Sequence, residues 1–198
     1  MVNQSTQLAR DIVQTMLDYG VTDVVLAPGS RSAPLALAFA QAEQAGNLRL
    51  HVRIDERDAG FLALGLAKGS GRLVPIVVTS GTAVANLFPA VVEAYHSAVP
   101  IVVFSADRPA ASRGRSAPQI IDQAHLFGHF SKVSLDLEPD VQNVEGIREA
   151  IEQTLTTHRG PAHINVQFDM PLVPDPADLP WQPSQVSLKQ VTESAHET

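Results

Sequence analysis

The segment Arg53-Ile-Asp-Glu-Arg-Asp-Ala-Gly60 joins two stretches with different hydrophobic patterns. Residues 48–54 form a short, apolar-leaning run typical of a strand, and Phe61 to Ala67 is a longer apolar run that favours a helix. Glu56 therefore lies where a predicted strand ends and a predicted helix begins. In a parallel α/β sheet, ligands bind at this edge.

A simpler interpretation of Glu56 stays open at this point. An acidic side chain in the first turn of a helix interacts favourably with the helix dipole, whether or not it binds a ligand. Arg53 and Arg57 flank Glu56 and could balance its charge. Whether Glu56 has a structural or a functional role therefore depends on which residues the other loops bring to the same edge of the sheet.

Strands and helices alternate along the whole chain. Strands are predicted over residues 23–27, 48–54, 74–79, 100–105, 132–137 and 162–168. Helices are predicted over residues 5–19, 35–45, 56–68, 83–97, 119–126 and 144–157. This order predicts an α/β fold, an open and mainly parallel sheet of about six strands with helices on both faces. Right-handed crossovers then place the loops that follow the strands at one edge of the sheet.

The length of 198 residues fits one domain with a tail. We expect the domain to span residues 1–172. Residues 173–198 are rich in proline and are expected to form a linker or tail toward a domain that this chain lacks. Trp181 could anchor that segment on the domain itself or on a neighbouring one.

Composition excludes several classes of protein. The formal net charge of −7 argues against nucleic-acid binding, which needs a basic surface. The chain has no cysteine, so it has neither disulfides nor a thiolate site. Neither a signal peptide nor an apolar stretch of membrane-spanning length is visible, so we expect a cytoplasmic protein without membrane insertion.

Three common catalytic motifs are missing. The sequence contains no Gly-x-Gly-x-x-Gly, no Gly-x-x-x-x-Gly-Lys-Ser/Thr and no Gly-x-Ser-x-Gly, which argues against a dehydrogenase, a P-loop enzyme and a serine hydrolase. His125 and His129 have a spacing that could ligate a metal, but Gly128 lies between them and no glutamate follows His125. We interpret the pair as structural and expect no metal ligands in this chain.

Two loops of small and polar residues follow predicted strands. In Pro28-Gly-Ser-Arg-Ser-Ala-Pro34, the glycine permits close approach of a ligand and Arg31 offers a fork for a carboxylate. Ser80-Gly-Thr-Ala-Val-Ala-Asn86 is small enough to pack against a flat ring. Each loop could equally be an ordinary helix entry, with tight packing between strand and helix.

Arginine outnumbers lysine by eleven to three, and several arginines lie in or beside predicted loops. Since arginine binds carboxylates and phosphates through two hydrogen bonds, this bias predicts a small anionic ligand in a local pocket. Arg108 could be a second carboxylate clamp, or it could form a salt bridge with Asp107. Solubility and helix capping would also explain individual arginines.

Five motifs in order resemble the MenD family, the thiamine-diphosphate-dependent 2-succinyl-5-enolpyruvyl-6-hydroxy-3-cyclohexene-1-carboxylate synthases of menaquinone (vitamin K2) biosynthesis. The resemblance covers residues 7–172, essentially the whole predicted domain. The motifs are Ala27-Pro-Gly-Ser-Arg-Ser-Ala-Pro-Leu35, Asp55-Glu-Arg57 with Ala63-Leu-Gly-Leu-Ala-Lys68, Thr79-Ser-Gly-Thr-Ala-Val-Ala-Asn-Leu87, Ser105-Ala-Asp-Arg-Pro109 and Ala117-Pro-Gln119.

The resemblance implies roles for particular residues of a pyrimidine-binding (Pyr) domain. Glu56 is the catalytic residue, which hydrogen-bonds N1′ of the thiamine diphosphate aminopyrimidine. The cofactor-binding residues are Pro28, Glu56, Thr82, Asn86 and Gln119. The residues that bind the substrates 2-oxoglutarate and isochorismate are Ser30, Arg31, Arg108 and Gln119.

The resemblance also implies parts that lie outside this chain. Family members hold the diphosphate through Mg²⁺ with a Gly-Asp-Gly…Asn motif of another domain, and no Gly-Asp-Gly occurs here. We therefore expect this transferase domain to be inactive alone and to act in a homodimer or homotetramer, facing a partner's diphosphate-binding domain. Two alternatives stay open: a stand-alone, non-catalytic Pyr-fold binding or regulatory protein, and one chain of a split enzyme.

Overall fold

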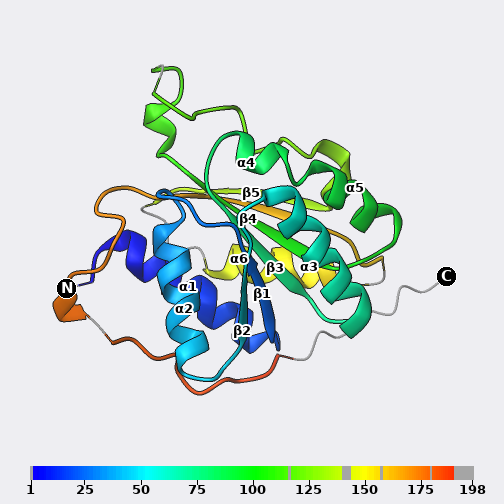
Figure 1. Ribbon diagram of the computed structural model, residues 1–198, viewed down its shortest axis with the longest axis horizontal. Coiled ribbons are helices and arrows are strands. Elements are labelled where there is room, and N and C mark those ends of the chain that lie inside the picture. The colour runs from blue at the N-terminus through cyan, green and yellow to red at the C-terminus, as the bar shows by residue number, and fades with distance from the viewer. Residues whose placement is uncertain (1, 116, 140–143, 157, 179, 190–198) are drawn as a thin grey trace.

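The computed structural model describes residues 2–115, 117–139, 144–156, 158–178 and 180–189. Six parallel strands form one open sheet in the order β2-β1-β3-β4-β6-β5 (Figure 1). The strands are β1 (Asp23–Leu26), β2 (Arg49–Val52), β3 (Val74–Val78), β4 (Ile101–Asp107), β5 (Val133–Leu137) and β6 (Ala162–Gln167). The parallel α/β sheet and its six predicted strands are thus confirmed.

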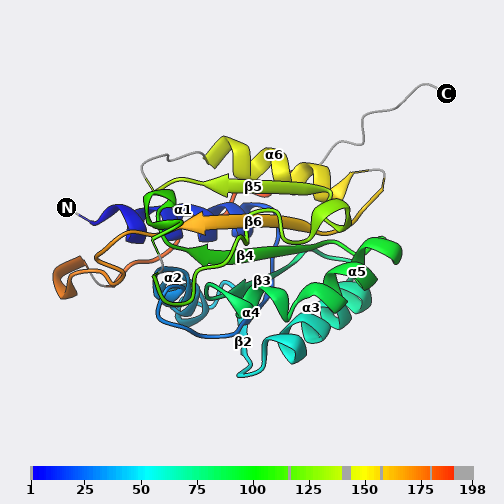
Figure 2. The same cartoon turned by 90° about the horizontal axis from the view of Figure 1, so that it is seen from above.

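Helices cover both faces of the sheet (Figure 2). They are α1 (Gln4–Asp18), α2 (Ala33–Gln44), α3 (Glu56–Ser70), α4 (Thr82–Ala85), α5 (Phe88–His96) and α6 (Val144–Leu155). Short 3₁₀ turns add η1 (Ala110–Ser112), η2 (Gly128–Phe130) and η3 (Pro176–Asp178). In the described part of the chain, no helix is long and apolar enough to cross a membrane.

Each face of the sheet has its own hydrophobic core. Helices α1, α2 and α6 pack on one face, where Phe39 and Ile147 join Phe104 of β4. Helices α3, α4 and α5 pack on the other, where Ala63 and Val91 join Val103 of β4. Val103 and Phe104 face opposite sides because side chains alternate along a strand, and helices on both sides explain why β4 is buried at every position.

Two of the predicted helices are wrong in detail. The helix predicted over 83–97 is divided into α4 and α5, because Pro89 occupies the first turn of α5 and has no N–H to continue the earlier helix. The helix predicted over 119–126 is absent, and the segment consists of turns at residues 118–119 and 124–127 with irregular chain between them. Gln119 has a φ of 61°, in the left-handed region, which is incompatible with a right-handed helix.

The order in which strands are added to the sheet reverses between β1 and β3, which are neighbours: β2 lies on one side of β1, and β3 and the later strands lie on the other. The loop after β1 leads to α2 on one face, whereas the loop after β3 leads to α4 on the other. Adjacent loops that leave toward opposite faces open a crevice at the carboxyl edge of the sheet, where α/β proteins bind ligands. The crevice is formed by the loop after β1 and the loop after β3.

The segment after β6 lies along α1. Trp181 packs against the core beneath α1 and α2, and the Arg10 guanidinium lies 5.6 Å from the centre of its ring. Asp18 accepts hydrogen bonds from the backbone N–H groups of Ser187 (3.2 Å, to the side chain) and Lys189 (2.8 Å, to the carbonyl). Trp181 therefore anchors this segment on the domain. The assignment of 173–198 as a linker stays a prediction.

Candidate functional site

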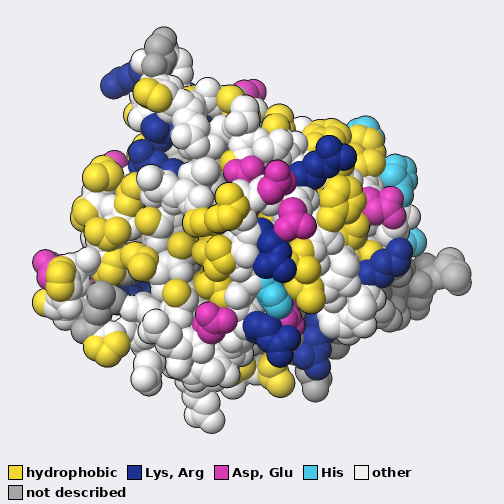
Figure 3. Space-filling model, in the orientation of Figure 1, with side chains coloured by type: hydrophobic (Ala, Val, Ile, Leu, Met, Phe, Trp, Pro, Cys, Tyr) yellow, Lys and Arg dark blue, Asp and Glu magenta, His cyan; other side chains and the backbone are white. Residues whose placement is uncertain are grey.

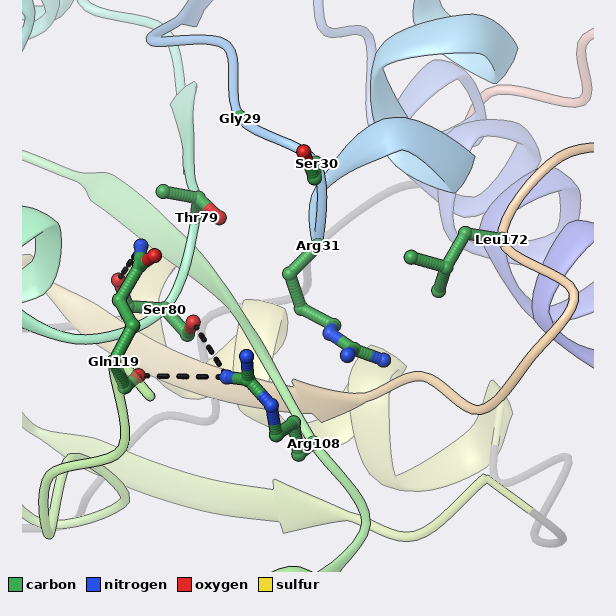
Figure 4. A pocket seen from close by; sticks show the side chains of 8 residues that line it. All are labelled: Gly29, Ser30, Arg31, Thr79, Ser80, Arg108, Gln119 and Leu172. Atoms are coloured by element: carbon green, nitrogen blue, oxygen red, sulfur yellow. Dashed lines mark hydrogen bonds between the residues drawn. The ribbon is translucent and has the colours of Figure 1, made fainter. Parts of the chain in front are cut away.

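A cavity of about 190 Å³ opens at the carboxyl edge of the sheet (Figure 4). The loops after β1, β3, β4 and β6, together with the 117–123 segment, form its walls. Its lining residues are Gly29, Ser30, Arg31, Thr79, Ser80, Arg108, Gln119 and Leu172. The cavity thus brings together the four residues predicted to bind substrate, although they come from three separate segments of the chain.

The loops after β1 and β3 approach each other very closely. A Cβ atom added at Gly29 would lie 2.4 Å from Thr79 Cβ and 2.6 Å from Thr79 Cγ2, closer than atoms can pack. Glycine is therefore required at this position for the two loops to meet. The contact places Ser30 and Arg31 against the end of β3, at the mouth of the cavity.

Two arginines give the cavity a positive charge. The half-buried Arg31 donates from Nη1 to the Phe168 carbonyl at 3.0 Å. Burial lowers the pKa of Arg31, the positive charge of Arg108 lowers it further, and Asp169 and Asp107 partly oppose this. The repulsion between the two guanidinium groups would be relieved by an anion between them, so the cavity is suited to a carboxylate.

Arg108 is held at the end of β4 without a salt bridge to Asp107. Its Nη1 makes two long contacts, to Ser80 Oγ at 3.4 Å and to the Gln119 carbonyl at 3.5 Å. Asp107 instead pairs with Arg113, whose Nη2 lies 3.1 Å from Asp107 Oδ2. The interpretation of Arg108 as a salt-bridge partner of Asp107 is therefore wrong, and its guanidinium faces the cavity.

Gln119 fixes the far wall of the cavity. Its Nε2 donates to the Ser80 carbonyl at 2.8 Å, as drawn in Figure 4. Gly81, the next residue of that loop, has a φ of 81°, and a Cβ added to it would lie 2.8 Å from Gln119 Cγ. The unusual backbone of Gln119 and the glycine at 81 thus permit one close contact between two loops.

Glu56 lies at the same edge but outside this cavity. Asp55 caps α3 by accepting from the Asp58 N–H at 3.0 Å, so Glu56 is the first residue of the helix. The half-exposed Glu56 accepts at Oε2 from Asn86 Nδ2 at 3.1 Å. Arg53 pairs with Asp58 (3.2 Å). A carboxylate with one neutral partner and an open side remains able to bind a ligand nitrogen.

Pro28 and Thr82, also predicted to bind cofactor, are both exposed. Neither lines the cavity. Leu172 lines the cavity but was not predicted, because it follows the last strand in a proline-rich segment without a recognisable motif. Thr79 had no predicted role either, although its contact with Gly29 shapes the entrance.

A larger hollow, of about 590 Å³, lies near the opposite edge of the sheet, where strands β4, β5 and β6 begin. Several histidines line it beside Tyr95, Lys132 and Arg159, and Figure 3 shows histidine side chains gathered beyond α5. The centre of the His129 ring lies 4.0 Å from that of Phe130 and 6.3 Å from that of Tyr95. Within the described residues, no group of three or more side chains could hold a metal.

Comparison with known proteins gives matches along most of the chain. The family model described as "Thiamine pyrophosphate enzyme, N-terminal TPP binding domain" matches residues 6–126, a range that contains the loops after β1, β2, β3 and β4. Many curated proteins are also similar to this chain, and three of them are named 2-succinyl-5-enolpyruvyl-6-hydroxy-3-cyclohexene-1-carboxylate synthase.

The protein from Kineococcus radiotolerans is 50% identical over 194 residues, which is 92% of this chain and 35% of that protein. The Arthrobacter protein is 50% identical over 176 residues, covering 87% and 29%. The Nocardia farcinica protein is 45% identical over 200 residues, covering 92% and 37%. The chain thus spans about a third of the length of these relatives.

Proposed function

This chain belongs to the family of N-terminal TPP-binding domains of thiamine pyrophosphate enzymes, and from this we propose that it is the Pyr domain of a 2-succinyl-5-enolpyruvyl-6-hydroxy-3-cyclohexene-1-carboxylate synthase. The proposed enzyme decarboxylates 2-oxoglutarate and adds the succinyl-semialdehyde unit to isochorismate, as a cytoplasmic transferase of menaquinone biosynthesis. The observation that carries this proposal is the placement of Arg31 and Arg108 on one cavity at the same sheet edge as the Glu56–Asn86 pair.

The residues at this edge fit one half of a thiamine diphosphate site. Bound thiamine diphosphate supplies the chemistry that breaks and forms carbon–carbon bonds beside a carbonyl group. Glu56 is proposed to hydrogen-bond N1′ of the aminopyrimidine, and Asn86 holds the Glu56 carboxylate in place at 3.1 Å. The exposed Pro28 and Thr82 and the nearby Gln119 would contact the ring, which needs the small loops seen here.

The cavity is proposed to hold the acidic substrates. Both 2-oxoglutarate and isochorismate carry two carboxylates, and Arg31 and Arg108 can each bind one through charged hydrogen bonds. Ser30 and the amide of Gln119 add neutral hydrogen-bonding groups on the walls. A volume of about 190 Å³ is below the roughly 300–1,000 Å³ of complete small-molecule sites, so this cavity is expected to be one part of a larger site.

The remaining part of the site is proposed to come from a partner. Val52, Ile54 and Phe61, which surround Glu56 in sequence, are 49%, 85% and 43% exposed. Exposed apolar side chains beside a functional residue favour a surface that another domain covers. We propose that a diphosphate-binding domain of a paired subunit, in a homodimer or homotetramer, covers it and holds Mg²⁺ and the diphosphate.

The proposal can be tested with a hybrid enzyme, in which this chain replaces the N-terminal region of the Kineococcus radiotolerans relative. Consumption of 2-oxoglutarate is measured with thiamine diphosphate, Mg²⁺ and isochorismate. We expect turnover by the hybrid enzyme and none by the 198-residue chain alone. A folded but inactive hybrid, beside an active relative, would contradict the proposal and favour a non-catalytic binding protein.

A further inference from the structure

A buried amide, Gln123, connects the loop after β3 to two strands of the sheet. Its side chain is 1% exposed. Gln123 Oε1 accepts from the Gly81 N–H at 2.9 Å, while Nε2 donates to the Ala106 carbonyl at 3.1 Å and to Asn165 Oδ1 at 2.8 Å. Both N–H groups and the carbonyl of this amide therefore have partners inside the protein.

The orientation of the Gln123 amide is fixed by its neighbours. Asn165 Nδ2 donates to two carboxylates, Asp107 Oδ2 at 3.1 Å and Asp136 Oδ1 at 2.7 Å. Because ionised carboxylates only accept, Asn165 must present its oxygen to Gln123. Gln123 must then direct Nε2 toward Asn165 and its oxygen toward Gly81. A reversed amide would place donor against donor and acceptor against acceptor.

The same hydrogen bonds connect the loop after β3, which contains Gly81, to the cavity that Arg108 lines. Asp107, which accepts from Asn165, also accepts at Oδ1 from the Arg108 N–H at 2.8 Å. A continuous path thus runs from Gly81 through Gln123, Asn165 and Asp107 to Arg108. Burial of these groups strengthens each bond and makes the loss of any one partner costly.

The anchored residue has a conformation that needs support. Gly81 has φ 81° and ψ −140°, a region that glycine enters readily and other residues rarely. It is buried, and it immediately precedes Thr82, the first residue of α4. Without Gln123, the Gly81 N–H would be left unpaired in the interior, and the flexible glycine would be free to turn.

We propose that Gln123 is a positioning residue. It holds the Gly81 turn and thereby fixes the position of Thr82 relative to Arg108 across the site. This inference rests on the proposed function for what the site binds. The hydrogen-bonding role itself is independent of that function, and it can be measured in the chain alone.

Gln167 offers a matched control. It is also 1% exposed and belongs to the same network, since its Nε2 donates to Asp136 Oδ1 at 3.0 Å. Its Oε1, however, accepts from the Ala110 N–H at 2.7 Å. Gln123→Met and Gln167→Met therefore remove equivalent buried amides, one that holds Gly81 and one that holds Ala110.

Amide hydrogen exchange of the two variants tests the local role. We expect Gln123→Met to accelerate exchange at Gly81 by at least about fivefold relative to the core strands, and Gln167→Met to do so at Ala110 instead. Equal exchange at Gly81 in both variants would overturn the proposal. If Gln123→Met does not fold, a scalar coupling across the hydrogen bond between Gly81 N and Gln123 Cδ can be sought in the wild-type chain, and its absence would have the same meaning.

The functional consequence is tested in the hybrid enzyme. We expect Gln123→Met to raise the KM for thiamine diphosphate by about five- to tenfold, the loss expected for one buried hydrogen bond, with a smaller change in kcat. Gln167→Met should leave this KM unchanged. Equal KM changes in the two variants would reject the positioning role. An inactive wild-type hybrid would reject the proposed function, and the role of Gln123 would then be tested by hydrogen exchange alone.

Discussion

Asn86 donates from Nδ2 to Oε2 of Glu56 at 3.1 Å, although the two residues follow different strands of the sheet. The contact joins the first turn of α3 to the end of α4. Since Arg53 pairs with Asp58 instead, the partner of Glu56 is a neutral amide and not a cation. The catalytic role of Glu56 stays a prediction, and the following variants separate it from a role limited to stabilising the start of α3.

Replacing Glu56 by glutamine tests its role in catalysis. We expect Glu56→Gln to lower turnover of the hybrid enzyme by about 10²–10⁴-fold, because a group that shares a proton with the cofactor is lost. The fold should be unaffected. The measurement is the rate of 2-oxoglutarate consumption, together with the circular dichroism of the variant.

Asp58→Asn is the control for this prediction. Asp58 lies in the same first turn of α3 and its side chain is 63% exposed, so its replacement removes the same charge near the same helix end. If Glu56 acted only through the helix dipole, both variants would lose about 0.3–1 kcal/mol of stability and neither would lose activity.

Arg31 is predicted to bind a substrate carboxylate. Arg31→Ala should weaken apparent substrate binding in the hybrid enzyme by roughly 2–5 kcal/mol if the charge pair is desolvated. Arg72→Ala serves as control, because Arg72 is exposed and its contact with Thr22 lies at the start of the strands. A change in the KM for thiamine diphosphate alone, with unchanged substrate kinetics, would show that the assignment is wrong.

Much of the fold was predictable because its signals are local. The central strands are the clearest case: because both faces of the sheet are covered, β3 is apolar at every position and β4 is apolar over residues 101–104. Pro89, which divides the predicted helix into α4 and α5, is also a local signal, because proline has no N–H for a hydrogen bond inside a helix. The four predicted substrate residues meet in one cavity because loops that follow parallel strands share an edge.

The remaining parts depend on contacts between distant residues. The 119–123 segment is not helical because the side chains of Gln119 and Gln123 bond to the backbone of the loop after β3, some forty residues earlier. The segment that brings Leu172 to the cavity is held at Asp169, whose carbonyl accepts from Ser5 Oγ at 2.6 Å, across 164 residues of chain. Hydrophobic periodicity contains no information on either contact.

The close approach of Gly29 to Thr79 predicts a specific steric effect. Gly29→Ala should lower the free energy of unfolding by about 1–3 kcal/mol, because its Cβ would overlap Thr79. Thr79→Gly in the same chain removes the overlapping atoms and should recover part of that loss, as a double-mutant cycle in urea would show. Gly65→Ala is the control: its Cβ meets nothing within 4 Å, and in a helix it should be neutral or stabilising. Additive effects of Gly29→Ala and Thr79→Gly would contradict the overlap.

His163 is fully buried on β6, its Nε2 lies 2.7 Å from Ser105 Oγ, and its Nδ1 has no hydrogen-bond partner among the described residues. Burial and the charge of His125 lower the pKa of His163 to about 4, and the charge of Asp136 opposes them only in part. Between about pH 4 and pH 6.5, the His163 imidazole is therefore neutral in the folded protein. In the unfolded chain, where the histidine pKa is about 6.5, the same group binds a proton in this range.

Stability that depends on a depressed histidine pKa is present above pH 6.5 and is lost as the pH falls toward 4. For His163 the loss across this window should be on the order of 3 kcal/mol. Asp136 does not interfere, because its pKa is lowered by hydrogen bonds from Arg113, Asn165 and Gln167 that outweigh the effect of burial, so its contribution falls away only at lower pH. Urea unfolding at pH 7 and pH 4.5 should show a clearly smaller decrease for His163→Gln than for the wild type, because the glutamine does not titrate. An equal decrease in both proteins would mean that other groups cause the acid sensitivity.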